Sequence, residues 1–277
     1  MKHSEGTFET FDGLQLYHQS WMPEGKARAT LAIVHGFGEH SGRYGNLVDY
    51  FVPRGCAVHA FDLRGHGRSP GARGYVERWD VFRNDVRAFL AVLQKQAPGT
   101  PLFLLGHSMG GLIVLEYVLR DPGGLAGVVA SGPLLAQAGV SPLLALASKL
   151  LSLVLPRLTL DVGLDATALS RDPAVVEAYA SDPLVHGQGT PRLGQEIARA
   201  YEWAHAHATD MRIPCLIVHG SADRLAPPEA SRVFYEHVTF EDKARYVYDG
   251  YYHEVFNEIG KEHVLADVEQ WLTKHQT

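Results

Sequence analysis

Short apolar runs alternate with helical patterns along most of the chain, and this alternation restricts the fold more than any other feature. The runs that predict strands cover residues 29–34, 56–61, 102–105, 125–130, 213–218 and 244–248. Several are apolar almost throughout, as strands covered on both faces must be. The helical patterns between them cover residues 79–96, 112–120, 228–237 and 261–274. This repetition predicts an α/β fold with a mostly parallel central sheet and helices on both faces.

Two segments depart from the alternation. Residues 7–11 and 14–18 alternate polar and apolar side chains around Asp12-Gly13, which predicts a hairpin closed by a two-residue turn. From Pro133 to Thr209 there is no convincing strand, only a leucine-rich part followed by several helix-start signals. We therefore expect a first core region at 1–132, a helical cap insertion at 133–209 and a second core region at 210–277.

The composition fits one large globular core. The 277 residues are 46% apolar and 20% charged, which is ordinary for a globular protein. The formal charge of -6 offers no attraction for DNA or RNA. The start of the chain lacks an apolar signal core, and no apolar run approaches the ~18 residues that span a bilayer. We expect a cytoplasmic protein with no nucleic-acid partner.

The sequence Gly106-His107-Ser108-Met109-Gly110 matches the G-x-S-x-G pattern of a nucleophilic serine. It follows an expected strand and precedes an expected helix, which is the context that the pattern needs. A serine on this sharp turn has its hydroxyl exposed, and the helix N-terminus favours negative charge developing there. Ser108 is therefore the candidate nucleophile.

Two later residues can activate this serine. Asp223 follows the strand at 213–218, and His253 follows the strand at 244–248, so both lie beyond carboxyl ends of expected parallel strands. The chain order Ser, acid, His is the order in which catalytic triads occur when the serine lies on such a strand-to-helix turn. His253 would act as the base, and Asp223 would fix its tautomer and stabilise its cation.

A tetrahedral intermediate also needs backbone N–H groups directed at its oxyanion. Met109, directly after the nucleophile, would supply one of them. Phe37, in the loop after the strand at 29–34, would supply the other.

No cofactor or metal is expected. The histidines of His205-Ala206-His207 would point apart on a helix, and no third ligand lies nearby in the sequence. The Gly-rich stretch at 64–69 fits neither a phosphate loop nor a dinucleotide fingerprint. The two cysteines, Cys56 and Cys215, fall inside strand-like runs, which predicts buried thiols rather than a disulfide framework.

These motifs together resemble the monoacylglycerol lipase family of α/β-hydrolases, a group close to the lysophospholipases. Four blocks carry the likeness: HGFGEHSGRY at 35–44, DLRGHGRS at 62–69, GHSMGG at 106–111 and GSADRL at 220–225. Within the insertion, SDPL at 181–184 also looks like the cap of that family.

The resemblance implies an α/β-hydrolase fold with a helical cap over the catalytic residues, an acyl tunnel lined by the cap and a small polar pocket for glycerol. By that likeness, Glu39 and Arg43 lie near the polar pocket, although an ion pair that stiffens the loop is an equal alternative. The leucine-rich part of the cap, which includes residues 142–155, either packs on the core or also offers an edge to lipid aggregates or a membrane surface.

The expected function is therefore a serine ester hydrolase that cleaves monoacylglycerols to fatty acid and glycerol through an acyl-enzyme. A lysophospholipase or a general carboxylesterase is the alternative among enzymes. A non-catalytic ligand receptor on the same fold is disfavoured, because binding alone does not need an activated nucleophile. The fold alone does not decide among these functions.

Overall fold

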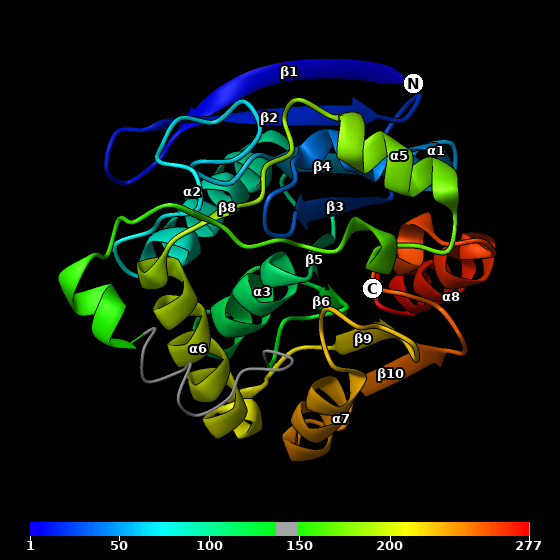
Figure 1. Ribbon diagram of the computed structural model, residues 1–277. Helices are drawn as coiled ribbons and strands as arrows, with labels where there is room; N and C mark the ends of the chain where they lie inside the picture. The colour runs from blue at the N-terminus through cyan, green and yellow to red at the C-terminus, as the bar shows by residue number, and fades with distance from the viewer. Residues whose placement is uncertain (137–148, 277) are drawn as a thin grey trace.

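The computed structural model describes residues 1–136 and 149–276, and an eight-stranded sheet forms its centre (Figure 1). The strand order is β1-β2-β4-β3-β5-β6-β9-β10. The strands from β4 to β10 in this order pair in parallel, and the β1-β2 hairpin adds antiparallel strands at one edge. The strands are β1 (Lys2–Glu9), β2 (Gln15–Met22), β3 (Ala29–Val34), β4 (Cys56–Phe61), β5 (Leu102–His107), β6 (Gly127–Ser131), β9 (Cys215–Gly220) and β10 (Lys243–Tyr248).

Helices cover both faces of this sheet, which confirms the predicted fold class. The helices of the core are α1 (Gly45–Phe51), α2 (Asp80–Gln96), α3 (Met109–Arg120), α7 (Pro228–His237) and α8 (Lys261–Lys274), with short 3-10 turns η1 (Ser41–Tyr44) and η4 (Val255–Asn257). Phe51 of α1 and Trp271 of α8 belong to one buried apolar cluster, whereas Phe82 of α2 and Ile113 of α3 belong to the other. Because the inner strands face both clusters, their residues are buried on both sides.

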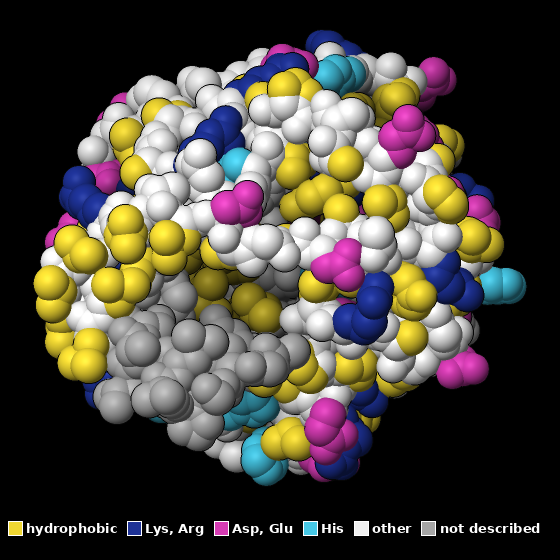
Figure 2. All heavy atoms as spheres, in the orientation of Figure 1, with side chains coloured by type: hydrophobic (Ala, Val, Ile, Leu, Met, Phe, Trp, Pro, Cys, Tyr) yellow, Lys and Arg dark blue, Asp and Glu magenta, His cyan; other side chains and the backbone are white. Residues whose placement is uncertain are grey.

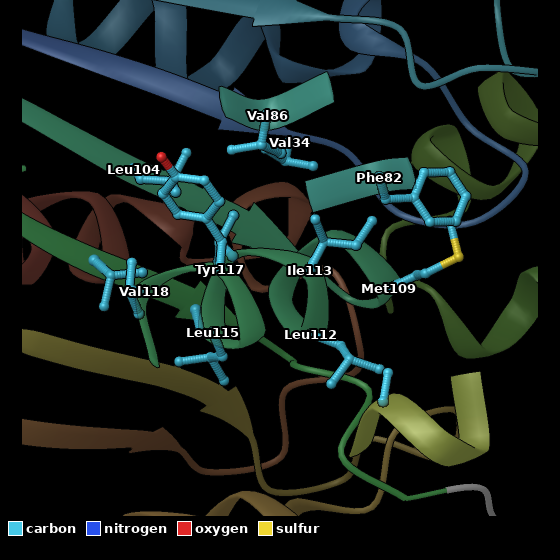
Figure 3. Packing of buried hydrophobic residues seen from close by; sticks show 14 of the residues in the cluster. Val34, Phe82, Val86, Leu104, Met109, Leu112, Ile113, Leu115, Tyr117 and Val118 are labelled. Carbon is cyan, nitrogen blue, oxygen red and sulfur yellow. The ribbon is translucent and has the colours of Figure 1, made fainter. Parts of the chain in front are cut away.

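Helix α3 is buried on every side except at its end. Its residues from Met109 to Leu119 are all buried. Figure 3 shows the reason: its side chains meet Val34 and Leu104 of the sheet as well as Phe82 and Val86 of α2. A helix that is apolar all round is stable only inside a core. The helix that follows the candidate nucleophile is therefore held rigidly.

The hairpin at the start is longer than the sequence predicts. The register pairs Glu9 with Gln15, so five residues rather than two connect the strands. The backbone N–H of Thr10 donates to Leu14 O at 2.9 Å, and the Thr10 hydroxyl donates to Asp12 at 2.5 Å. The prediction of a two-residue turn was wrong because these bonds close a wider loop. Helix α1 was also missed, because its seven residues are too few to give a clear period.

Helices α5 (Pro173–Ser181) and α6 (Pro191–Ala206) lie in the described part of the insertion between β6 and β9, after a helical segment at 149–154, and α6 packs alongside α3 (Figure 1). Both start as the sequence predicts, since Asp172 and Thr190 accept backbone N–H groups at the two N-termini. The insertion also holds the 3-10 turns η2 (Ala166–Ala168) and η3 (Ala208–Asp210) and two very short strands, β7 (Leu160–Asp161) and β8 (Gln188–Gly189).

Strands β7 and β8 pair with each other antiparallel, so the expectation that this region has no strand was wrong. A two-residue strand is too short to show alternation. Residues 142–148 of the leucine-rich part lie outside the described residues. We call residues 133–209 the cap below, with the boundaries as the sequence predicts them.

Candidate active site

Ser108 sits on the sharp turn between β5 and α3. Its φ of 55° is the one positive value among the non-glycine residues that the structure describes, and such strain collects at functional sites. The glycines on either side allow the strand and the helix to cross closely. A Cβ at Gly106 would lie 2.2 Å from Gly110 O, and a Cβ at Gly110 would lie 2.2 Å from Val34 O. The turn therefore needs glycine at both positions and carries the serine at its apex.

Asp223 lies just after β9, and four donors surround its carboxylate. Oδ1 accepts the backbone N–H groups of Leu225 and Ala226 at 2.8 and 2.9 Å. Oδ2 faces His253 Nδ1 at 2.7 Å and His219 Nε2 at 3.0 Å. Burial opposes the charge, but the neighbouring His253 and these imidazole hydrogen bonds hold the pKa of Asp223 well below its usual range. The residue is therefore an ionised acceptor.

His253 lies in the loop after β10, and its ring is oriented by Asp223. Because Oδ2 is an acceptor, Nδ1 carries the hydrogen and Nε2 keeps its lone pair. Burial lowers the pKa of His253, but the charge and hydrogen bond of Asp223 outweigh it and raise that pKa overall. The cap supports this loop, since Glu254 N donates to Leu169 O at 2.8 Å. His253 and Ser108 line the same two cavities.

The loop after β3 lies against Ser108. A Cβ at Gly36 would lie 3.1 Å from the Cβ of Ser108. No residue in the described part of the chain accepts the backbone N–H of Phe37 or of Met109. Phe37 lines both cavities beside Ser108, and Met109 follows the serine directly. Both N–H groups are thus free to bind a ligand oxygen.

Glu39 and Arg43 form an ion pair that braces this loop and also border the polar side of the site. Glu39 Oε1 accepts the backbone N–H of Gly36 at 2.7 Å and the hydroxyl of Tyr44 at 2.8 Å. Arg43 donates to Glu39 at 3.0 Å and to both oxygens of Glu254 at 2.6 and 2.9 Å. Burial raises the pKa of Glu39, but Arg43 together with the neighbouring imidazoles and the Gly36 hydrogen bond outweighs it, so the carboxyl remains ionised. The ion pair is therefore present, and binding of glycerol by these two residues stays a prediction.

The polar cavity beside Ser108 is small. Its volume is about 30 Å³, and a further space of about 10 Å³ lies behind it. His107 lines both spaces with its ring centroid 4.6 Å from that of His253. Burial and the neighbouring His253 lower the pKa of His107 to about 4, so this ring is neutral. From the cap, Tyr179 lines the first space, with its ring centroid 4.7 Å from the guanidinium carbon of Arg43.

The other cavity beside Ser108 is large and mostly apolar, with a volume of about 680 Å³. Figure 2 shows a hollow at the centre of this face with hydrophobic side chains inside it. Most of the lining comes from the cap: Leu134, Leu160, Asp161, Val162, Gly163, Leu164, Asp165, Gly189, Thr190, Leu193, Gly194 and Ile197. Its volume lies in the range of small-molecule sites, and an acyl chain suits its apolar walls.

Sequence reasoning missed four residues that shape this site. Glu254 pairs with Arg43, Tyr179 covers the polar cavity, His107 lines it and His219 shares Asp223 with His253. Two of them had a local signal: His219 is a histidine at a strand end four residues before an aspartate, and His107 directly precedes Ser108. The contacts of Glu254 and Tyr179 join segments far apart in the sequence.

Comparisons with known proteins agree with this arrangement. The model of a hydrolase family described as serine aminopeptidase, S33, matches residues 25–260. The chain belongs to this family. It is 40% identical over 277 residues to a monoacylglycerol lipase of Mycolicibacterium smegmatis, covering 98% of each chain. It is 32% identical to phospholipase YtpA of Bacillus subtilis over 86% of this chain and 92% of that protein.

Among solved structures, a soluble variant of Saccharomyces cerevisiae monoglyceride lipase in complex with a substrate analogue matches with a TM-score of 0.90. The identity is 29%, over 100% of this chain and 97% of that one. The resemblance to monoacylglycerol lipases and the α/β-hydrolase fold are thereby confirmed, and this S33 family member is a hydrolase.

Two further observations concern the described residues of this family member. None of the described helices is both long enough and apolar enough to cross a membrane. Nε2 of His205 lies 3.0 Å from the carbonyl oxygen of Leu135, and Nδ1 of His207 lies 2.8 Å from the carbonyl oxygen of Trp203. These rings are therefore held by the fold.

Proposed function

We propose that this hydrolase cleaves monoacylglycerols to a fatty acid and glycerol, with Ser108, Asp223 and His253 as its catalytic triad. The observation that carries the proposal is the contrast between the two cavities at Ser108. One is large and apolar, whereas the other is small and lined by Glu39, Arg43 and Glu254. The apolar walls of the first suit an acyl chain, and the charged groups of the second suit the hydroxyl groups of a small neutral alcohol.

The reaction has two steps. Ser108 Oγ attacks the ester carbon while its proton passes to Nε2 of His253, and the N–H groups of Phe37 and Met109 bind the oxyanion. The ester C–O bond then breaks, and His253 returns the proton to the departing glycerol oxygen. Water deprotonated by His253 attacks the acyl-enzyme in the same way, which releases the fatty acid and restores the serine.

The charge of the polar cavity favours glycerol over a phosphate head group. Two carboxylates, Glu39 and Glu254, face one guanidinium, so the cluster carries a net charge of about -1. Arg43 already donates to both of them, and a phosphate would compete with carboxylates for it. The similarity of the chain to a phospholipase supports the alternative of a lysophospholipase. The charge of the polar cavity argues against that alternative.

We further propose that the cap touches lipid aggregates or a membrane surface. Large apolar side chains of the helical segment 149–154 and the chain after it are exposed, among them Leu153 at 67% and Val154 at 76%. Figure 2 shows hydrophobic side chains gathered over this segment, on the left of the view. The apolar surface continues through Leu160 and Val162 into the large cavity. Apolar patches of this kind mark interaction sites.

A substrate panel tests the function. Monoacylglycerols of increasing chain length, below their aggregation limits, would be compared with lysophospholipids, a triacylglycerol emulsion and short nitrophenyl esters. Each buried CH₂ contributes a free energy of ~0.8 kcal/mol, so kcat/KM should rise roughly four-fold per methylene until the cavity is full. Lysophospholipids should react at least ~100-fold more slowly. A flat profile would indicate a general carboxylesterase, and faster lysophospholipid cleavage would indicate the alternative.

The same panel tests the nucleophile. Ser108→Ala should lower kcat by about 10⁴-fold or more with an unchanged unfolding midpoint, because a triad member is removed from an intact fold. Ser4→Ala, an exposed serine of β1, is the matched control and should behave as the parent protein. Ester turnover retained by folded Ser108→Ala would refute the assignment.

A further inference from the structure

His219 contacts the carboxylate of Asp223 at the same oxygen as His253. It is the second-last residue of β9, and its side chain is fully buried. Its Nε2 lies 3.0 Å from Asp223 Oδ2 and 3.0 Å from Ala226 O. Both partners are acceptors, so Nε2 carries the hydrogen and donates it. The same carboxylate oxygen therefore accepts from two imidazoles.

The other ring nitrogen of His219 is also engaged. Nδ1 lies 2.9 Å from Ser231 Oγ of α7. Ser231 in turn accepts from Arg245 of β10 at 3.2 Å. The Ser231 hydroxyl has one hydrogen and two acceptors within reach, Nδ1 of His219 and the carbonyl oxygen of Pro228, each at 2.9 Å. The two acceptors at Nε2 fix the hydrogen there, and the contact with Ser231 connects the ring to α7 and, through Arg245, to β10.

We propose that His219 is a positioning residue for the triad, which shares the Asp223 carboxylate with His253 and limits how strongly that carboxylate stabilises the His253 cation. The inference rests on the proposed function, because it assigns the roles of base and acid to His253 and Asp223. A second donor on one oxygen disperses its charge and also stops the carboxylate from rotating. The base therefore stays oriented without being held protonated near neutral pH.

Other groups around His253 set the background for this effect. Asp223 comes from the loop after β9, Glu254 from the loop after β10, Glu39 from the loop after β3, and His107 from the end of β5. The two glutamates raise the pKa of His253, and the neutral ring of His107 lies against it in a tilted arrangement. Among the described residues, His219 hydrogen-bonds Asp223, Ala226 and Ser231 and none of these three, so a change at residue 219 reaches His253 through Asp223.

The test compares His219→Leu, which removes the donor, with His219→Gln, whose side-chain amide reaches the place of Nε2. His219→Leu should lower kcat by roughly 10- to 100-fold, as expected for a lost hydrogen bond to a charged group, with KM unchanged because His219 does not line the substrate cavities. The acidic limb of kcat/KM should move to higher pH by about half a unit or more. His219→Gln should restore most of both properties.

A second pair keeps the test decisive if His219→Leu does not fold. Asn reaches only the place of Nδ1, so His219→Asn should show the loss and the shift, whereas His219→Gln should not. Ser231→Ala removes the other partner of the ring and should leave the pH limb in place, since two acceptors still fix the Nε2 hydrogen. Equal losses in the Gln and Asn variants, without a pH shift, would mean a purely structural role and would overturn the proposal.

Imidazole NMR titration separates this inference from the proposed function, because it needs no substrate. The pKa of His253 should be higher in His219→Asn than in the parent protein and in His219→Gln. An unchanged pKa in His219→Asn would overturn the inference even in an active enzyme. The expected pKa difference combined with no monoacylglycerol cleavage would instead refute the substrate while supporting the role of His219.

Discussion

At the scale of single residues, the site combines one strained backbone with one strongly polarised pair. Ser108 adopts its positive φ because β5, α3 and the loop after β3 surround it closely. The pair of Asp223 and His253 is buried, so its charge interaction is weakly screened by solvent. Geometry and electrostatics both come from the surroundings of these side chains.

The pH dependence of turnover follows from the His253 pKa. The base must be neutral to accept the Ser108 proton. Because Asp223 raises the pKa of His253 despite burial, kcat/KM should fall as pH decreases, with a midpoint above the ordinary histidine value of ~6.5. A pH–rate profile with a soluble short-chain ester measures it. A rate that stays constant down to pH 5 would contradict His253 as the base.

At the scale of elements, the crossing of β5 and α3 depends on glycine. A Cβ at Gly110 would meet Val34 O at 2.2 Å and His35 O at 2.4 Å. Both are backbone atoms, which cannot rotate away as a side chain could. The crossing therefore tolerates no side chain at residue 110.

Gly110→Ala should accordingly destabilise the protein by about 3 kcal/mol or more, since overpacking displaces backbone, and should lower activity sharply. Gly194 of α6 is the matched control for stability alone, because a Cβ there meets nothing within 4 Å but the residue lines the large cavity. Gly194→Ala should stabilise the helix by roughly 0.5–1 kcal/mol. Urea unfolding followed by circular dichroism measures both changes, and an equal effect of the two substitutions would contradict the packing argument.

The exposed apolar segment of the cap leads to a prediction about binding to lipid vesicles. Leu153→Glu together with Val154→Glu should weaken binding to lipid vesicles by about tenfold or more, because two apolar side chains no longer enter the interface. Turnover of a soluble short-chain ester should remain unchanged. Ile259→Glu, a similarly exposed apolar residue outside the cap, is the control. Vesicle sedimentation with undiminished binding of the double variant would refute lipid contact through this segment.

At the scale of the whole molecule, buried histidines make the fold sensitive to acid. Burial lowers the pKa of His59, His107 and His186 to about 4 each. Between about pH 6.5 and 4 the unfolded chain binds these protons and the folded chain does not. Stability therefore falls as the pH falls through this window. Asp85 acts in the opposite direction, since burial raises its pKa to about 6 despite its pairing with Arg64.

The free energy of unfolding should therefore decrease by about 2 kcal/mol between pH 7 and pH 5, with the histidines outweighing Asp85. Urea titrations at several pH values measure this decrease. His59→Gln should reduce the slope, and His263→Gln, at an exposed position of α8, should not. A stability that is constant from pH 7 to pH 5 would contradict the argument.

The sequence by itself determined the elements and their order. The strands at 29–34 and 56–61 and the helices at 228–237 and 261–274 match the structure residue for residue, because long apolar periods are local properties of the chain. Ser108, Asp223 and His253 could be selected for the same reason, since each follows an expected strand in a known order. The missed helix α1 and the misjudged hairpin are short, so a local pattern has little length in which to show itself.

Only the tertiary structure decided which side chains meet around those three residues. Arg43 and Glu254 are 211 positions apart, and their pairing sets the charge of the polar cavity. Tyr179 reaches the same cavity from the cap, and His219 shares an oxygen of Asp223 with His253. Such contacts depend on how loops from separate strand ends converge at one edge of the sheet. That convergence is a property of the packed molecule, so no local stretch of sequence encodes it.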